Sequence, residues 1–247
     1  MNEEKKLKLT IAHLYPNLLN IYGDWGNVLT LCKRCEFRGI EYEVVKINTG
    51  DKIDSSKYDI YFIGGGQDKQ QIEVANELYK NKTALTEAAQ AGKVFLAICG
   101  GYQLLGKYYL PHNGEKLEGI GILNAYTVAG DTRFIGNVTA KTDFLTPNTL
   151  VGFENHSGLT YLEEGTTPIA KIIVGNGNNS VDKGEGARKN NVFGTYLHGS
   201  VLPKNPHFAD YLIKTALSVK YGYDVELQKL DDTIEMNTHN DLINKKY

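Results

Sequence analysis

A short apolar run that ends in one cysteine and two glycines constrains this chain more than any other feature. Val94–Ile98 is apolar at every position, which predicts a buried strand of a parallel sheet, and the apolar spacing after Gly101 predicts a helix. A strand that becomes a helix within one or two residues needs a strained corner residue with small neighbours. Ala97 and Gly101 supply small neighbours on either side of Cys99. The pattern predicts Cys99 at the corner, above the carboxyl edge of the sheet, where α/β proteins bind ligands.

Two interpretations of Cys99 compete. As a nucleophile it would lie at a helix N-terminus, where the dipole and unpaired N–H groups favour the thiolate. As a structural residue it would simply be buried, as free cysteines often are. The small residues around it favour the nucleophile. Cys32 and Cys35 have redox or zinc spacing, but no second pair of ligands is present and both fall in a predicted helix, so we interpret them as structural.

Composition narrows the classes of protein to which the chain can belong. A formal charge of −2 provides no electrostatic case for binding nucleic acid or an anionic membrane. The apolar runs are too short to span a bilayer, so no membrane insertion is expected. Three cysteines in 247 residues argue against a disulfide framework and point to a reducing cytoplasm.

The first part of the chain alternates between strand-like and helix-like segments. Strands are predicted at residues 7–14, 42–47 and 58–63, and a helix is predicted from Asp24, as its cap, to about residue 38. Together with the strand before Cys99, this alternation predicts an α/β fold: a doubly wound, mostly parallel sheet with helices on both faces.

The residue pattern changes from alternating strands and helices to short strand-like runs after Gly106. Strand-like runs separated by Gly and Asn turns predict a mixed or antiparallel extension of the same domain, at residues 120–128, 134–140, 150–154, 169–174 and 192–196. An amphipathic helix is predicted from residue 208 to about 221. We therefore expect one domain over residues 1–230, followed by a polar, loosely held tail at 231–247.

A thiolate nucleophile needs a base, and six histidines are available. His198 is the best placed, because it follows a predicted strand that would deliver it to the edge of the sheet. The alternative is a solvent-exposed loop histidine. His112, His207 and His239 are weaker candidates, since they fall in a turn, at a helix start and in the tail.

The oxyanion formed by attack on a carbonyl group needs N–H donors. Gly65 and Gly66 follow the strand at 58–63, and Gly100 follows Cys99, so the backbone amides of Gly65 and Gly100 are the expected donors. The glycine-rich loop could instead hold a phosphate, but no Lys-Ser/Thr pair follows it, which argues against a P-loop.

Several motifs resemble those of a known enzyme family. Residues 97–103 (AICGGYQ) resemble the cysteine motif of class I glutamine amidotransferases, and two further motifs look like the cobyric-acid-synthase branch of that class: 194–199 (GTYLHG) and 152–158 (GFENHSG). The segment 19–27 (LNIYGDWGN), with Arg34 and 38–40 (RGI), is similar to the glutaminase subunits of lipid II isoglutaminyl synthases. The resemblance runs from about residue 7 to 221 in motif order.

The resemblance implies a reaction and roles for individual residues. Cys99 would attack the side-chain amide of L-glutamine to form a thioester, while His198 would activate the thiol and protonate the departing ammonia. Gln103 matches a glutamine-contacting position of the class, and Asn155 matches another. Arg133 is a candidate clamp for the α-carboxylate of glutamine, with a surface arginine as the alternative.

The chain departs from many members of the class at Ser200, where they have a glutamate two residues after the histidine. Glu154 and Asp24 are the carboxylates of this chain that could replace it, but the resemblance implies a Mur-ligase-like partner subunit as the source. That partner would use ATP and receive the ammonia to amidate the D-glutamate of the lipid II stem peptide. This chain has no nucleotide motif, so no cofactor or metal is expected in it. The rival interpretations are a glutaminase subunit of another synthetase, such as a cobyric-acid-type one, and a non-catalytic regulatory module.

Overall fold

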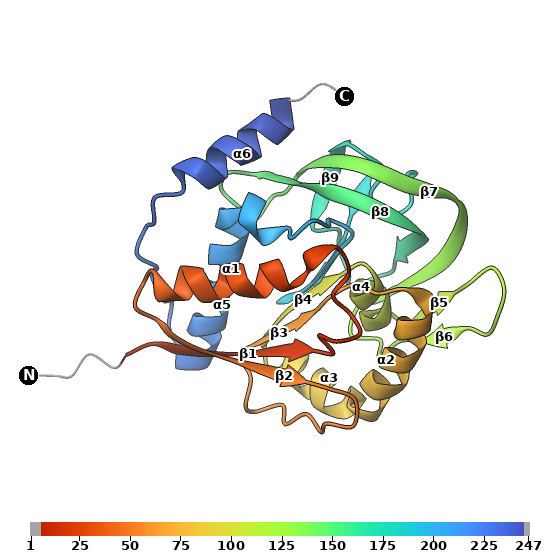
Figure 1. Cartoon of the computed structure of the whole chain (residues 1–247), viewed down its shortest axis with the longest axis horizontal. Helices are drawn as coiled ribbons and strands as arrows, with labels where there is room; N and C mark the ends of the chain where they lie inside the picture. The colour runs from red at the N-terminus through yellow and green to blue at the C-terminus, as the bar shows by residue number, and fades with distance from the viewer. Residues whose placement is uncertain (1–5, 245–247) are drawn as a thin grey trace, which may run out of the picture.

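The computed structural model describes residues 6–244, apart from the side chains of Tyr22 and Asp68, and contains two sheets flanked by helices (Figure 1). The first sheet has the strand order β11-β12-β4-β3-β1-β2. Its strands are β1 (Lys8–Leu14), β2 (Glu41–Ile47), β3 (Ile60–Ile63), β4 (Val94–Ile98), β11 (Ala187–Lys189) and β12 (Val192–Thr195). All neighbours pair in parallel except β11, which is antiparallel to β12. The predicted mostly parallel sheet is confirmed.

Helices cover both faces of this sheet. Val28 of α1 and Leu212 of α5 share one buried cluster with Leu96 of β4, whereas Val74 of α2 shares the other with Phe95. Successive side chains of a strand point to opposite faces, so β4 is apolar throughout because it is covered on both sides. The helices are α1 (Trp25–Glu36), α2 (Asp68–Lys80), α3 (Lys82–Gln90), α4 (Gly100–Leu105) and α5 (Pro206–Tyr221), with short 3₁₀ turns η1 (Ile21–Gly23) and η2 (Leu202–Lys204).

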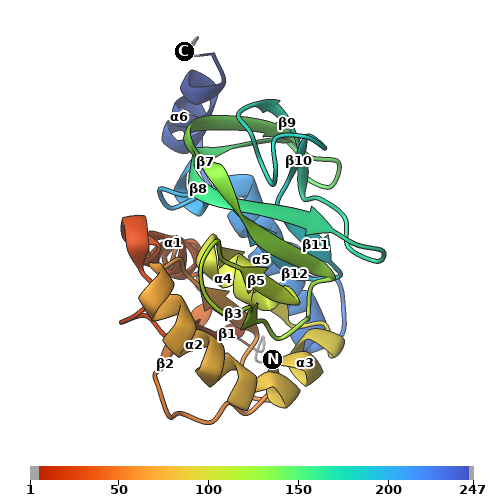
Figure 2. The ribbon, with the colours of Figure 1, turned by 90° about the vertical axis from the view of Figure 1, so that its right-hand side faces the viewer.

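The second sheet is mixed, as the sequence predicts, but the run expected at 192–196 of this extension lies instead in the first sheet as β12, parallel to β4. Its strands run in the order β10-β9-β7-β5-β6, and β8 pairs with β7. They are β5 (Tyr108–Leu110), β6 (Leu117–Glu118), β7 (Ala125–Lys141), β8 (Thr149–Leu162), β9 (Ala170–Val174) and β10 (Gly184–Glu185). The antiparallel β7–β8 ribbon lies near α4 in both views of the molecule (Figures 1 and 2). This position brings the ribbon beside the carboxyl edge of the first sheet.

A bulge divides the long strand β7. The pairing with β8 shifts between Ala129 and Phe134, and the residues 131–133 between them are exposed. The sequence pattern predicts two separate runs here, because the apolar alternation stops at Gly130. The structure instead has one strand with a bulge, and bulges re-aim the side chains that they carry.

The expectation of a loosely held C-terminal tail is wrong for the described residues. Residues 233–244 form α6 (Thr233–Asn244), and His239 on it is fully buried. The two ring nitrogens of His239 lie 2.8 Å from Oγ1 of Thr149 and 2.8 Å from the carbonyl oxygen of Lys204. Polar contacts hold this helix, so an apolar pattern could not reveal it. Residues 245–247 of the expected tail lie outside the described residues.

Two arginines of α1 tie the chain before α6 to the domain. Arg34 pairs with both Asp210 of α5 and Asp232 at 2.6 Å, and Arg38 pairs with Asp210 at 2.6 Å. Within residues 6–244, no helix has the length and apolar character needed to cross a membrane.

Candidate active site

Cys99 occupies the corner between β4 and α4, as predicted. Its backbone has φ 49° and ψ −106°, a region that non-glycine residues rarely adopt. A methyl group on Gly101 would lie 2.7 Å from the carbonyl oxygen of Gly64, so only glycine fits there. The strain is stored where α4 begins, which is typical of a functional site.

His198 lies close to Cys99 across Gly65. β12 ends at Thr195, and the N–H of His198 donates to the carbonyl oxygen of Phe153 at 2.7 Å, which fixes the backbone of the loop. A methyl group on Gly65 would lie 3.2 Å from Cβ of Cys99 and 3.4 Å from Cε1 of His198. The structure thus brings the predicted nucleophile and base together, although they are 99 positions apart in the sequence.

The imidazole of His198 is neutral. Burial lowers the pKa of His198 to about 4, and its electrostatic interactions with His156, Lys204 and Arg133 act in the same direction. Lys204 is held there because its Nζ donates to the carbonyl oxygen of His198 at 3.2 Å. The ring is therefore neutral at physiological pH, which is the state that a general base requires.

The expectation that the helix N-terminus favours a thiolate is not met. Burial raises the pKa of the Cys99 thiol to about 12, and the charge of Asp24 acts in the same direction. The Gly100 N–H and Arg133 oppose this shift but do not reverse it. Desolvation of the charged form outweighs the dipole of a six-residue helix. Cys99 is a thiol in this structure, and its proton must move during the reaction.

Gly65 is a correction to the predicted oxyanion donors. Its N–H donates to Oδ2 of Asp24 at 2.7 Å, so in this conformation it is not available to an oxyanion beside Cys99. Asp24 makes no side-chain cap to α1, contrary to expectation, because its carboxylate is used here; Asn20 accepts the Trp25 N–H instead, at 2.8 Å. Gly100 remains beside the Cys99 sulfur, and Gly66 lines the cavity.

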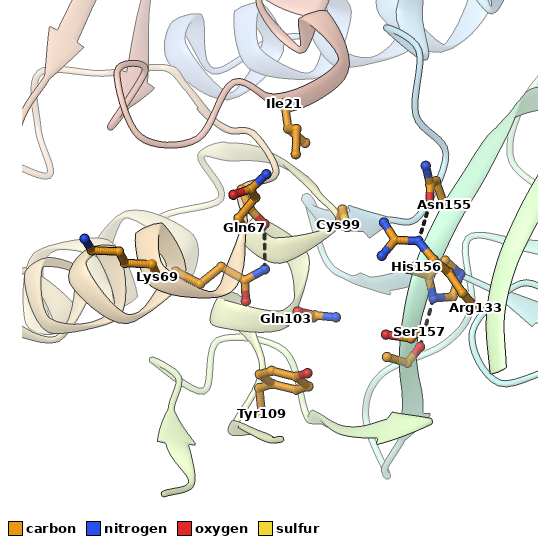
Figure 3. Close-up of a pocket in the computed structure, with 13 residues that line it drawn as sticks. Ile21, Gln67, Lys69, Cys99, Gln103, Tyr109, Arg133, Asn155, His156 and Ser157 are labelled. Carbon is orange, nitrogen blue, oxygen red and sulfur yellow. Dashed lines mark hydrogen bonds between the residues drawn. The ribbon is translucent and has the colours of Figure 1, made fainter. Parts of the chain in front are cut away.

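A cavity of about 460 Å³ opens in front of Cys99. Gln103, Arg133 and Asn155, all predicted to contact glutamine, line it together with Cys99 (Figure 3). Its other walls come from the Gly66–Gln67 loop, the start of α2, Tyr109 and the β8 segment 155–158. A cavity of this size accommodates a small polar molecule, and it brings both sheets into one site.

Arg133 reaches the cavity from the bulge of β7. Its Nε donates to Oδ1 of Asn155 at 2.6 Å, and Figure 3 shows both side chains on the wall opposite Gln67. The Asn155 contact orients the guanidinium, which leaves its two terminal nitrogens as donors. A guanidinium in this position can bind a carboxylate through two parallel hydrogen bonds.

Comparison with known proteins agrees with this geometry. Residues 10–206 match the CobB/CobQ-like glutamine amidotransferase domain. The chain belongs to this family. It is 43% identical over 238 residues to the lipid II isoglutaminyl synthase (glutamine-hydrolyzing) subunit GatD of Staphylococcus aureus, which covers 96% of each chain. It is 42% identical over 228 residues to the protein of the same name from Streptococcus pneumoniae, covering 92% of this chain and 87% of that protein.

A solved structure supports the fold independently. The structure of PurLQS from Thermotoga maritima matches with a TM-score of 0.59 and 17% identity, covering 87% of this chain and 99% of that chain. At this level of identity the likeness concerns the fold alone. The predicted amidotransferase fold and family are confirmed.

In this amidotransferase, Gln103 is positioned by a buried chain of hydroxyl groups. Its Nε2 donates to the hydroxyl of Tyr196 at 3.1 Å, which contacts Oγ1 of Thr160 at 2.6 Å, which in turn contacts Oγ1 of Thr127 at 2.7 Å. A methyl group on Gly158 would lie 2.5 Å from Nε2 of Gln103, so the amide rests directly on β8. This packing fixes the orientation of the amide against the cavity.

Several residues of the cavity wall, Gln71 and His156 among them, were not predicted from the sequence. Gln71 of α2 donates from Nε2 to the carbonyl oxygen of Gly66 at 3.0 Å, and no motif marks it. His156 stacks face to face on Tyr196, with ring centroids 3.6 Å apart, and its Nδ1 lies 2.9 Å from the carbonyl oxygen of Gly158. The Asn-His pair in the β8 motif could have indicated His156, but only the tertiary structure shows that its ring is packed as part of the wall.

The third catalytic residue of an amidotransferase triad is not supplied by the candidates in this chain. Oγ of Ser200 donates to the carbonyl oxygen of Gly23 at 2.7 Å. The carboxylate of Glu154 accepts from both nitrogens of Asn176 and from the N–H of Gly177, at 2.7 to 3.1 Å. Asp24 is bound to Gly65. Each candidate acid is therefore committed to a backbone turn or loop.

The burial of Cys32 and Cys35 agrees with their interpretation as structural residues. Both are buried on α1, and burial raises the pKa of Cys32 to about 11 and that of Cys35 to about 12. Among residues 6–244, no three His, Cys, Asp or Glu side chains are grouped as metal ligands.

Proposed function

We propose that this chain is the glutamine-hydrolysing subunit of a lipid II isoglutaminyl synthase. It would release ammonia from L-glutamine for amidation of the D-glutamate of the lipid II stem peptide. The observation that carries the chemistry is the pairing of Cys99 on its strained corner with His198 across Gly65. The two relatives, both glutamine-hydrolyzing subunits of lipid II isoglutaminyl synthase and each more than 40% identical to this chain over most of its length, support lipid II as the acceptor.

Glutamine would bind with its α-carboxylate on Arg133 and its side-chain amide toward Cys99. Asn155 holds the guanidinium, and Gln103 contacts the substrate from the floor of the cavity. This arrangement anchors one end of the amino acid and leaves its other end at the sulfur. Proximity and orientation of this kind lower the entropic part of the barrier.

Acylation then proceeds with His198 as the proton carrier. The sulfur of Cys99 attacks the amide carbon while the thiol proton passes to the imidazole, and the carbonyl oxygen becomes an oxyanion. The N–H groups of Gly100 and Gly66 are the proposed donors to that oxyanion. The C–N bond breaks as His198 returns the proton to nitrogen, so ammonia leaves and a glutamyl thioester remains.

Hydrolysis reverses these roles. His198 takes a proton from water, the resulting hydroxide adds to the thioester carbon, and the C–S bond breaks. The sulfur recovers the proton from His198, which releases glutamate and restores the thiol.

The partner in this proposal is a Mur-ligase-like synthetase subunit. It would use ATP to activate the acceptor carboxylate and would receive the ammonia, since this chain has no nucleotide motif. It would also supply the carboxylate for His198. The low pKa of His198 supports this, because a neighbouring carboxylate would stabilise the imidazolium that forms when the proton arrives.

Trapping of Cys99 distinguishes an enzyme from a regulatory module. A chloroketone analogue of glutamine should add once to the chain, and intact mass spectrometry should place the adduct on Cys99. L-glutamine should protect against it, whereas D-glutamine should not. Absence of labelling in the complete complex would refute the proposed glutaminase.

Hydrolysis rates test the role of the partner. We expect weak glutamine hydrolysis by the isolated chain and a marked increase with the purified synthetase subunit, compared at equal Cys99 concentration. Replacing the partner carboxylate nearest His198 by its amide should cancel the increase while the complex stays intact by size exclusion. Equal rates with and without the partner would refute a partner-supplied acid.

A further inference from the structure

The chain before α1 binds both backbone polar groups of Gly65. Asp24 accepts the Gly65 N–H at 2.7 Å, and the Ile21 N–H donates to the Gly65 carbonyl oxygen at 3.1 Å. Asp24 is fully buried. The orientation of this peptide is thus set from outside the glycine-rich loop.

The neighbouring glycines are packed against the same chain segment. A methyl group on Gly64 would lie 2.3 Å from the carbonyl oxygen of Leu19, and one on Gly66 would lie 2.4 Å from Cδ2 of Leu19. Gly66 nevertheless lines the cavity beside Cys99. No backbone or side-chain acceptor that the structure describes takes the Gly66 N–H. With the preceding amide bound to Asp24, the loop leaves the Gly66 amide for a ligand beside Cys99.

We propose that Asp24 is a positioning residue for glutamine hydrolysis: by accepting the Gly65 N–H, it fixes the Gly64–Gly66 loop so that the Gly66 N–H completes the oxyanion hole with Gly100. The inference rests on the proposed function. It assigns Asp24 no contact with glutamine and no proton transfer. The role requires an oxygen acceptor at this position and does not require a negative charge.

The surroundings of Asp24 favour its hydrogen bond to Gly65 but disfavour its negative charge. Oδ1 of Asp24 is buried without a hydrogen-bond partner among the described residues, so an ionised carboxylate is costly here. Burial raises the pKa of Asp24 to about 7. Its anion also opposes formation of the Cys99 thiolate, as does Glu185, whereas Arg133 favours it. The charge of Asp24 works against the nucleophile, which leaves the hydrogen bond to Gly65 as the useful contact.

Asp24→Asn and Asp24→Ala discriminate these roles, because asparagine keeps the acceptor oxygen and removes the charge. In the complex with the synthetase subunit, Asp24→Ala should lower kcat for glutamine hydrolysis by about 10- to 100-fold with little change in KM, as expected when an oxyanion donor is misplaced. Asp24→Asn should retain kcat within about threefold and should lower the apparent pKa of Cys99 alkylation by iodoacetamide. Asp54→Asn, at an exposed site that contacts Ser56, is the matched control.

The outcomes separate this inference from the proposed function. If the wild-type complex does not hydrolyse glutamine, the proposed function fails. If it does, and Asp24→Ala keeps the wild-type kcat, the positioning role is overturned. An equal loss in Asp24→Asn and Asp24→Ala would also overturn it, because the carboxylate itself would then be required. Should Asp24→Ala fail to fold, Asp24→Val fills the same buried space without an acceptor and serves in its place.

Discussion

The two sheets contribute to the site in different ways. The parallel sheet carries Cys99 and His198 on backbone that is packed to the limit, since a methyl group on Gly101 or Gly194 would overlap its neighbours at 2.7 and 2.1 Å. The mixed sheet carries Arg133 on an exposed bulge of β7, and a methyl group on Gly136 of the same strand would meet nothing within 4 Å, although Gly158 of the facing strand is packed against Gln103.

The parallel sheet thus carries the groups proposed to react, and the mixed sheet carries a group proposed to bind the substrate. Reacting groups must hold their geometry closely, so the nucleophile and base lie where two elements pack on both faces of a sheet. A carboxylate clamp tolerates more adjustment, because a guanidinium has several donors and a long side chain. Substitutions in the parallel sheet should therefore change kcat or folding, and substitutions on the bulge should change KM.

The largest expected effect is the loss of the nucleophile. Cys99→Ala should abolish glutamine hydrolysis and leave the melting temperature close to that of the wild type, because the side chain stands at a corner and fills little of the core. Ammonia release by the complex, measured with a coupled dehydrogenase assay, checks the first part. Turnover near the wild-type level would remove Cys99 from the mechanism.

Replacement of the base should come next. His198→Ala should lower kcat by about 10²-fold, the usual scale for a general base. His156→Ala is the matched control on the facing strand: it should cost less in kcat and more in stability, because its ring packs on Tyr196. The opposite order of kcat values would show that His156 is the base.

Substitution on the bulge should change binding. Arg133→Ala should raise KM for glutamine by about 10- to 100-fold, the value of a charged hydrogen-bonded pair, with a smaller change in kcat. Arg133→Lys should recover only part of this, since an ammonium cannot bind a carboxylate through a planar fork. Alkylation of Cys99 by iodoacetamide, which lacks the carboxylate, should persist; its loss alongside the loss of chloroketone labelling would point to local unfolding instead.

The smallest expected effect is on folding stability and comes from a pair of glycines. Gly101→Ala should destabilise the chain by about 1–3 kcal/mol, because the new methyl group meets backbone that cannot yield. Gly136→Ala should change stability by less than about 0.5 kcal/mol. Urea unfolding compares the two directly. Equal stabilities would contradict the packing difference between the corner at Cys99 and the exposed part of β7.

Local pattern determined much of the parallel half of the molecule. The run Val94–Ile98 is apolar throughout because both faces of β4 are covered, and this signal is visible without any partner strand. The small residues around Cys99 mark the corner for another local reason: at a sharp turn the backbone segments lie so close together that no large side chain fits between them. The position of His198 after β12 followed from the same pattern of strands.

The mixed half was less predictable. The expected runs at 120–128 and 134–140 join across a bulge, and α6 is held by His239 and by polar contacts that no periodicity reports. Both features depend on partners distant in the sequence. The prediction of a loosely held tail was wrong because a polar helix and a polar coil have the same composition.

The sequence by itself determined the family and the parallel sheet and singled out Cys99 and His198 as the candidate nucleophile and base, because strand burial and the strained corner restrict residue types at short range. Only the tertiary structure decided which backbone amide of the glycine loop is already hydrogen-bonded and how the pKa of the thiol is shifted. Gly65 and Gly66 are alike in sequence, but a carboxylate 41 residues away binds one of them. The helix N-terminus predicts a thiolate, but burial among distant elements raises the pKa of the Cys99 thiol to about 12. Hydrogen-bond partners and desolvation are set by whatever surrounds a group in space, and that is known only once the chain has folded.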